Sequence, residues 1–178
     1  MARITVNETG THPTILLSTD IANGNIDTGN IAGANVLAVT CLQDVTITAS
    51  TGIYSYVDFC SPDTNKLPTP ADNEISMNVV IDPTVYFGNN SAASGSAANE
   101  GLSGLSQDKI PVQFLVVWNY DANIANITDG NIGNLTNVYY SSGRGFVSSL
   151  APTASPEAPV WVTPMTIAVD GTMYSGVS

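Results

Sequence analysis

The residues with the most reactive side chains are few and far apart in this sequence. His12 is the only histidine, and the two cysteines are Cys41 and Cys60. A Ser-His-Asp or Cys-His nucleophilic site would have to use His12, yet no Gly-x-Ser-x-Gly turn accompanies it. One histidine and two distant cysteines also lack the spacing of a zinc motif. We therefore expect neither a nucleophilic site nor a metal site.

Carboxylates offer a second chemistry. Asp58 and Glu74 flank predicted strands and are the pair that a glycosidase would use, but with 15 acidic residues any two could face each other. The glycine-containing stretch "SSGRGF", residues 141–146, lacks the lysine and the strand-loop-helix context of a phosphate-binding loop. We predict no enzyme, no catalytic residues and no cofactor.

A phrase rich in Gly, Asn and Ile occurs twice, as "NIDTGNIAGANV" at 25–36 and "NITDGNIGNLTNV" at 126–138. The nearby acids could ligate calcium, but neither copy has the glutamate that ends an EF-hand loop. The alternative is turn chemistry, in which Gly and Asn occupy positive-φ positions and isolated Ile side chains pin the loop to the body. We expect ordered surface loops without a tight calcium site; the acids concerned are Asp20, Asp27, Asp121 and Asp129.

The composition is acidic but sparsely charged. The 178 residues carry a net charge of -11, although charged residues make up only 11% of the chain. A surface so poor in cations cannot bind nucleic acid by neutralising phosphates, and it does not favour anionic membranes. The N-terminal "MARITVNETGTHPT" does not resemble a signal peptide, so we expect no export by that route. Cys41 and Cys60 could pair or stay reduced. The basic residues are Arg3, Lys66, Lys109 and Arg144.

Alternating apolar and polar residues predict strands over most of the chain. "VLAVTCL" at 36–42 and "DVTITAS" at 44–50 read as a hairpin or as one strand continuing through a bend. "IYSYVDFC" at 53–60 extends the sheet or forms an arm. The three prolines of residues 61–73 predict an extended exposed loop, because proline cannot complete a strand ladder. A strand follows at 74–82, with Ile75, Met77, Val79 and Ile81 on one face.

The second half of the chain predicts one helix among strands. Residues 96–107 suit a short helix docked through Leu102 and Leu105, although a flexible linker is an alternative. "VQFLVVWNY" at 112–120 is apolar on both faces and predicts the most buried strand. A hairpin-like pair around Gly143 to Gly145 and a long strand near 159–174 complete the pattern. The sequence therefore predicts an all-β fold of two packed antiparallel sheets, a sandwich or barrel, with one short flanking helix and long loops.

The order of these segments resembles a known family. "LAVTCLQDVTITAS", a long Pro-rich segment, "NEISMNVVID", a small-residue helix, "VQFLVVW", "GRGFVSSL" and "VWVTPMTIAVDGT" follow one another as in the major tail tube proteins of long-tailed, siphovirus-type bacteriophages. The similarity covers roughly residues 36–172. It implies one domain over 36–178, preceded by an N-terminal arm or loop over 1–35.

The resemblance also implies a function. Subunits would form hexameric rings that stack into a hollow tube in the virion, assembled in the host cytoplasm. The genome would pass through without specific binding, and the partners would be other copies, the tape measure, the terminator and the tail tip. The loop at 50–73 would contact the neighbouring ring through Tyr54, Tyr56, Pro62, Lys66, Pro68 and Pro70. Acids at strand ends would line the lumen and repel phosphates; the candidates are Asp44, Asp58, Glu74 and Asp82.

Two readings from other classes stay open. A secreted or cell-surface binding module, such as an adhesin, is equally compatible with a chain rich in Asn, Thr, Tyr and Gly. A capsid decoration protein or a tail-tip component lies between the two readings. A tube subunit would form rings or filaments without ligand, whereas a binding module would stay small until it met its glycan.

Overall fold

The computed structural model describes residues 12–22, 31, 36–58, 61–120, 137–154 and 160–178. Strands dominate, as predicted, and the all-β fold is confirmed. The predicted helix at 96–107 is present, and a second, shorter helix precedes it. The elements are β1 (His12–Ser18), β2 (Leu37–Val39), β3 (Leu42–Asp58), β4 (Ser61–Val80), α1 (Pro83–Phe87), α2 (Ala97–Gln107), β5 (Pro111–Tyr120), β6 (Tyr139–Leu150) and β7 (Val162–Val177).

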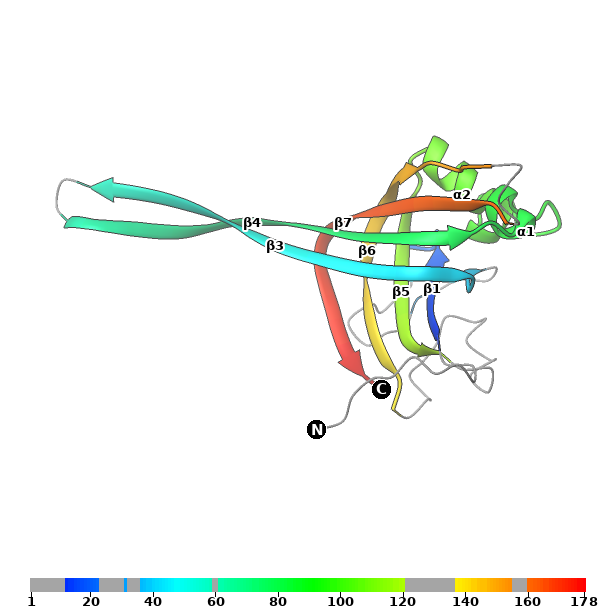
Figure 1. Ribbon diagram of the computed structural model, residues 1–178, viewed down its shortest axis with the longest axis horizontal. Helices are drawn as coiled ribbons and strands as arrows, with labels where there is room; N and C mark the ends of the chain where they lie inside the picture. Colours follow the sequence, from blue (N-terminus) through cyan, green and yellow to red (C-terminus); the bar gives the residue numbers. More distant parts are fainter. Residues whose placement is uncertain (1–11, 23–30, 32–35, 59–60, 121–136, 155–159) are drawn as a thin grey trace.

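The named strands belong to one hydrogen-bonded sheet of seven strands in the order β2-β1-β5-β6-β7-β4-β3, and every neighbouring pair is antiparallel. We expected two separate sheets. A single sheet can form both layers because β7 bends sharply between its pairing with β4 and its end beside β6 (Figure 1). Two register shifts between β6 and β7 accompany this bend, as β-bulges do.

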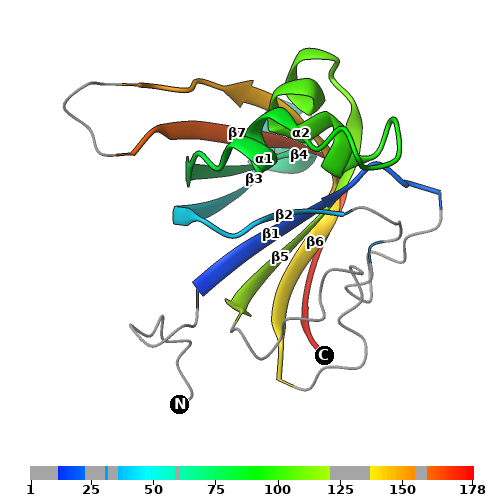
Figure 2. The same cartoon turned by 90° about the vertical axis from the view of Figure 1, so that its right-hand side faces the viewer.

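The segments 36–42 and 44–50 do not form a hairpin. β2 pairs with β1 and β3 pairs with β4, so these two consecutive strands are the opposite edges of the sheet. Only Thr40 and Cys41 separate them along the chain, and the backbone N–H of Val80 donates to the carbonyl of Cys41 at 2.8 Å. The chain therefore continues through a bend from one edge to the other, which brings the two edges of the curled sheet together (Figure 2).

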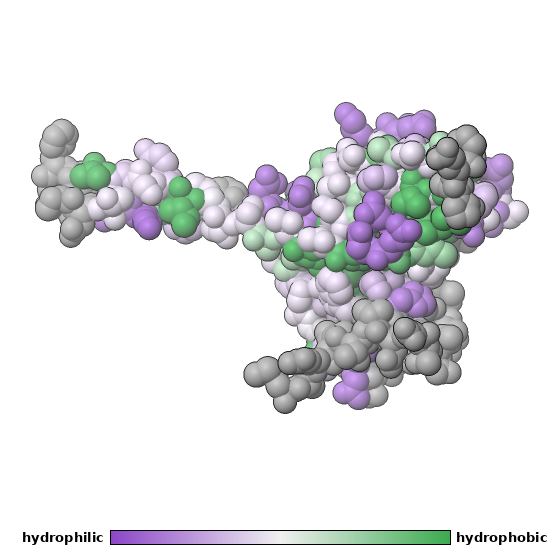
Figure 3. Space-filling model, viewed as in Figure 1, coloured by the Kyte–Doolittle hydropathy of each residue, from purple (hydrophilic) through white to green (hydrophobic). Residues whose placement is uncertain are grey.

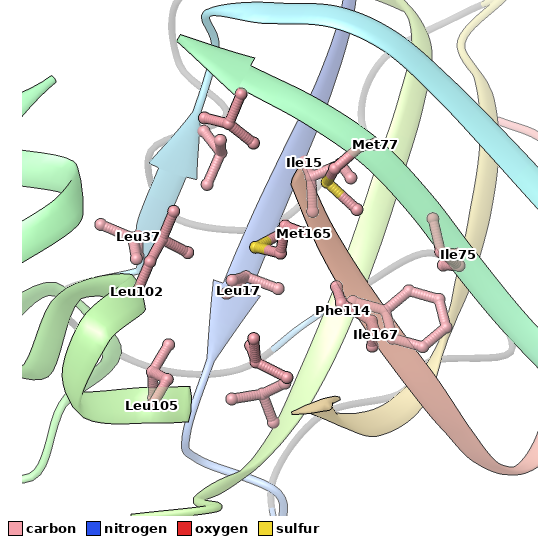
Figure 4. Packing of buried hydrophobic residues seen from close by; sticks show 14 of the residues in the cluster. Ile15, Leu17, Leu37, Ile75, Met77, Leu102, Leu105, Phe114, Met165 and Ile167 are labelled. Atoms are coloured by element: carbon pink, nitrogen blue, oxygen red, sulfur yellow. The ribbon is translucent and has the colours of Figure 1, made fainter. Parts of the chain in front are cut away.

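The main core lies inside the curled sheet and under α2. Phe114 of β5 is fully buried and packs with residues of β1, β4 and β7, among them Ile15, Ile75 and Ile167 (Figure 4). The predicted alternation on β4 is confirmed, because Ile75, Met77 and Val79 are buried. The prediction for β5 is also confirmed, since every side chain from Val112 to Val117 is buried.

A second apolar cluster covers the outer face of the sheet. Ile31 is fully buried there, against Leu16 of β1 and Leu115 and Val117 of β5. An Ile of the first Gly/Asn/Ile repeat therefore pins its segment to the body, as expected. The second repeat, residues 126–138, lies outside the described residues except for Asn137 and Val138, and Val138 joins this cluster.

The N-terminal segment differs from expectation. We expected an arm or loop over residues 1–35, but residues 12–18 form β1, between β2 and β5 in the sheet. Ile15 and Leu17 reach the main core while Leu16 reaches the outer cluster. A strand with both faces buried has no apolar–polar alternation, and this removes the pattern that would have predicted it.

The predicted hairpin around Gly143 is also wrong, because β6 runs without interruption from Tyr139 to Leu150. The glycines make room for neighbours instead of turning the chain. A Cβ on Gly143 would lie 2.6 Å from the ring of Phe114, and one on Gly145 would overlap the carbonyl oxygen of Ala168. Glycine inside a strand commonly marks such a close approach.

Candidate assembly surfaces

The hairpin of β3 and β4 is much longer than the body of the sheet. β7 pairs with β4 only from Glu74 to Val80, whereas β3 and β4 pair from Leu42↔Val79 to Asp58↔Ser61. The paired segments 51–58 and 61–71, which we call the arm, extend away from the body as a two-stranded ribbon (Figure 1). We expected an irregular Pro-rich loop over 61–73, and that expectation is wrong.

The ribbon tolerates prolines because only one edge of β4 is paired in the arm. Pro62, Pro68 and Pro70 lie where β4 has β3 on one side and no described strand on the other. A proline nitrogen directed to an open edge breaks no ladder hydrogen bond. The register also shifts between Thr51 and Ile53, opposite Pro68 and Ala71. A Cβ on Gly52 would overlap the hydroxyl of Thr69, so glycine is needed at this bulge.

The arm exposes large apolar side chains. The exposed fractions are 62% for Ile53, 60% for Tyr54, 63% for Val57 and 51% for Leu67. Tyr54 stacks on Tyr56 with ring centroids 6.1 Å apart. Apolar residues recur along the ribbon in Figure 3. A two-stranded ribbon is marginally stable by itself, so such an arm is typical of a segment that packs against another chain.

The candidate inter-ring residues are all in the arm. Tyr54, Tyr56, Lys66 and Pro68 are exposed there, and Lys66 lies opposite Ser55. Pro62 and Pro70 belong to β4, but their side chains lie outside the described residues. Whether these six residues contact a neighbouring ring remains a prediction.

Two of the candidate lumen acids share one face of the sheet. Asp44 lies opposite Asn78 and Glu74 lies opposite Thr48; because both are exposed on alternate positions of the same ladder, they lie on the outward face. Asp44 also has a structural role at the bulge that begins β3. Its carboxylate accepts from the backbone N–H of Asn78 at 3.0 Å and from Nδ2 of Asn78 at 2.7 Å.

The other two candidates lie elsewhere. Asp82 is the N-cap of α1, where its carboxylate accepts from the backbone N–H groups of Thr84 at 2.7 Å and Val85 at 3.3 Å. Asp58 is at the far end of the arm, and its side chain is not described. The structure therefore does not bring the four acids together.

Two further acids, which the sequence pattern did not predict, lie on the outward face. Asp72 is exposed two residues before Glu74 on β4, and Asp170 is exposed two residues after Ala168, which pairs with Glu74. We call Asp44, Asp72, Glu74 and Asp170 the acidic face. One cation, Arg144, lies opposite Asp170, and its guanidinium donates to the carbonyl of Ile21 at 3.1 Å. Only the strand register reveals this grouping, because the sequence separates its members by up to 126 residues.

The geometry does not favour the glycosidase reading. Asp58 pairs with Ser61, which lies thirteen residues before Glu74 on the same strand. At about 3.3 Å per residue the two acids are roughly 40 Å apart. Glycosidases place their two carboxyl groups about 5–9.5 Å apart. This pair therefore cannot act on one glycosidic bond within a single chain.

The remaining candidates for chemistry are the two cysteines and the acids of the repeats. Cys41 is exposed, while Cys60 lies outside the described residues, as do Asp27, Asp121 and Asp129 of the repeats. Within the described ranges, no cluster of three or more His, Cys, Asp or Glu side chains could hold a metal ion. None of the helices in the described part of the chain is long and apolar enough to cross a membrane.

Comparisons with known proteins agree with this architecture. No family model and no curated protein matches the sequence. Among solved structures, the chain is similar to one from the virion of a native gene transfer agent particle, at 12% identity and a TM-score of 0.54, covering 97% of this chain and 100% of that one. The chain is also similar to one from the tail of an empty gene transfer agent particle, refined with C6 symmetry. The identity is 12%, the TM-score is 0.52, and the match covers 92% of this chain and 95% of that one.

A third similar chain comes from the sheath/tube terminator of an extracellular contractile injection system. Its identity is 12%, its TM-score is 0.51, and the match covers 99% of this chain and 100% of that chain. Identities this low show the fold alone. The chain therefore has a tail-tube-like β fold over nearly its whole length.

Proposed function

We propose that this protein is a structural subunit of a phage-type tail tube, in which rings of the chain stack into a hollow conduit. The observation that carries the proposal is the combination of a tail-tube-like fold, matched over 97% of the chain, with a projecting arm on which Ile53, Tyr54, Val57 and Leu67 are each more than half exposed. The similar chain from a tail with C6 symmetry supports six copies in each ring. The protein would then reside in the tail of the virion.

The acidic face would line the lumen in this arrangement. Asp44, Asp72, Glu74 and Asp170 lie among serine and threonine side chains such as Thr46, Thr48, Ser76 and Thr166, which follow the same register. A wall with this charge would repel phosphates and allow the genome to slide without binding. Asp82 and Asp58 are the less suitable members of the original set, since one caps α1 and the other is at the end of the arm.

The strand register argues against the competing glycosidase function. Asp58 and Glu74 lie too far apart in the β3–β4 ladder to act on one glycosidic bond. The proposed partners are further copies of the chain and, at the two ends of the tube, the tape measure, terminator and tail-tip proteins.

The arm provides the test of this proposal. Replacing residues 51–71 with Asn-Gly would join Ser50 to Asp72, which already pair, through a two-residue turn. We expect size-exclusion chromatography with light scattering to show large assemblies for the wild type and no species larger than a single ring for the shortened chain. As a control, the wild type and the shortened chain should have equal melting temperatures, which shows that the body of the sheet still folds. Identical mass distributions for both chains would contradict the proposal.

A further inference from the structure

A cluster of exposed apolar side chains lies at the end of the body opposite the arm. Phe87 of α1 is 64% exposed, and Trp161 and Val160, just before β7, are 53% and 47% exposed. With Ile81 and Pro83 they line a hollow of about 340 Å³. We call these five residues the end patch. Phe87 also packs edge-on against Tyr86, with ring centroids 4.8 Å apart.

Backbone hydrogen bonds and a helix cap hold the segments of the end patch in place. The backbone N–H of Ile81 donates to the carbonyl of Trp161 at 2.9 Å, which ties the end of β4 to the start of β7. Asp82 caps α1 and so fixes the helix that carries Phe87. Exposed Trp and Phe side chains around a preformed hollow are typical of the energetic centre of a protein interface.

The structure assigns an occupant to this patch: we propose that the arm of a second copy docks in it. The inference rests on the proposed tube function and adds the receptor surface for the arm. The arm and the end patch are at opposite ends of the long axis of the molecule, so the arm cannot reach the end patch of its own chain (Figure 1). The same two surfaces, repeated from copy to copy, form a heterologous contact that propagates along an axis.

Chemistry favours the same pairing. One face of the arm offers Ile53 and Val57, which are 62% and 63% exposed, and the end patch offers a concave apolar lining. Lys66 is the one described cation of the arm, and exposed Asp82 lies beside the end patch. Docking would bury both apolar surfaces and place opposite charges at the rim, where they steer association.

The test separates the two surfaces by substitution. An arm variant carries Ile53→Ser and Val57→Ser, which share one face of the arm, and a patch variant carries Phe87→Ser and Trp161→Thr. Val177→Thr, at a side chain that is 58% exposed outside both surfaces, is the matched control. Electron microscopy of the wild type and the control should show stacked rings. Each variant alone should show single rings, with stacks at least tenfold rarer.

The decisive sample is the mixture. The intact arms of a patch-variant ring can dock in the intact patches of an arm-variant ring. The resulting pair leaves only altered patches at one end and altered arms at the other, so no third ring can add. The mixture should therefore give pairs of rings and no longer stacks. Long tubes from the patch variant alone, or only single rings in the mixture, would overturn the inference. Absence of rings in every sample, wild type included, would instead contradict the tube function itself.

Crosslinking gives a second measurement if the patch variant folds poorly. In a background with Cys41→Ser and Cys60→Ser, the pair Ser55→Cys and Thr84→Cys is treated with a short bismaleimide, because both positions are exposed, one on the docking face of the arm and one beside Pro83 of the end patch. A ladder of covalent multimers is expected for the double variant, while either cysteine alone should give at most occasional dimers. A double variant in assembled tubes that yields no ladder would overturn the docking.

Discussion

The substitution Gly143→Ala tests the packing of β6 against the core inside the curled sheet. Gly143 lies opposite Phe114 in the β5–β6 ladder, and a Cβ there would be 2.6 Å from Cζ and 3.1 Å from Cε1 of that ring. The ring cannot move aside easily, because Phe114 is fully buried among core side chains. Gly143→Ala therefore overpacks the core, which typically costs about 1–3 kcal/mol.

A second effect of Gly143→Ala has the opposite sign. Alanine restricts the unfolded chain and contributes about 0.4–1 kcal/mol where the native backbone is compatible with it. The overpacking dominates, and the expected net loss in the free energy of unfolding is about 1–2 kcal/mol. For a chain of this size that loss corresponds to a fall in Tm of roughly 2–8 °C.

The assay is urea unfolding followed by tryptophan fluorescence, with all variants at one protein concentration so that assembly contributes equally. Phe114→Leu provides the control, because the shorter side chain vacates the space that the new Cβ needs. In that background Gly143→Ala should cost nothing measurable, giving a coupling free energy of about 1–2 kcal/mol. An equally stable Gly143→Ala chain, or an equal loss in both backgrounds, would refute the reasoning.

Three further predictions concern other parts of the molecule. Ile31→Ala should lower the free energy of unfolding by about 2–5 kcal/mol in the same urea assay, because Ile31 is fully buried in the outer cluster; a loss below 1 kcal/mol would contradict this role. Asp82→Ala should cost about 0.5–2 kcal/mol and speed hydrogen exchange at the Thr84 and Val85 amides, whereas Asp82→Asn should retain most of the cap; equal exchange in all three proteins would exclude capping. Glu74→Lys with Asp170→Lys should create salt-dependent DNA binding, measured by filter retention, that the wild type lacks; DNA retention by the wild type at physiological salt would argue against a repelling lumen.

The sequence predicted the elements whose pattern is set by one wet face. β4 has alternating residues, of which Ile75, Met77 and Val79 are buried, and α2 begins at the Ser96 cap and docks through Leu102 and Leu105. β1 gave no such pattern because both of its faces are covered, by the main core and by the outer cluster. A strand of seven residues without alternation is difficult to distinguish from a loop.

Residues 53–58 form one strand of the arm, as one of the two predicted alternatives had it, but the loop expected over 61–73 failed for a different reason. Proline disfavours strands that are paired on both edges, and we read Pro62, Pro68 and Pro70 as a loop. The rule does not apply to a ribbon with one open edge, and the sequence does not tell how many neighbours a strand has. The acidic face could not be predicted for a similar reason, because it depends on which strands are neighbours. Asp170 lies near Glu74 only through the β4–β7 register.

Negative-stain electron microscopy of the purified wild-type protein across a concentration series tests whether the chain is a tube subunit. A tube subunit should form hollow rings, and stacks of such rings at high concentration, without any added ligand. A monodisperse monomer at every concentration would contradict a tube subunit and would favour a binding module that stays small until it meets its partner.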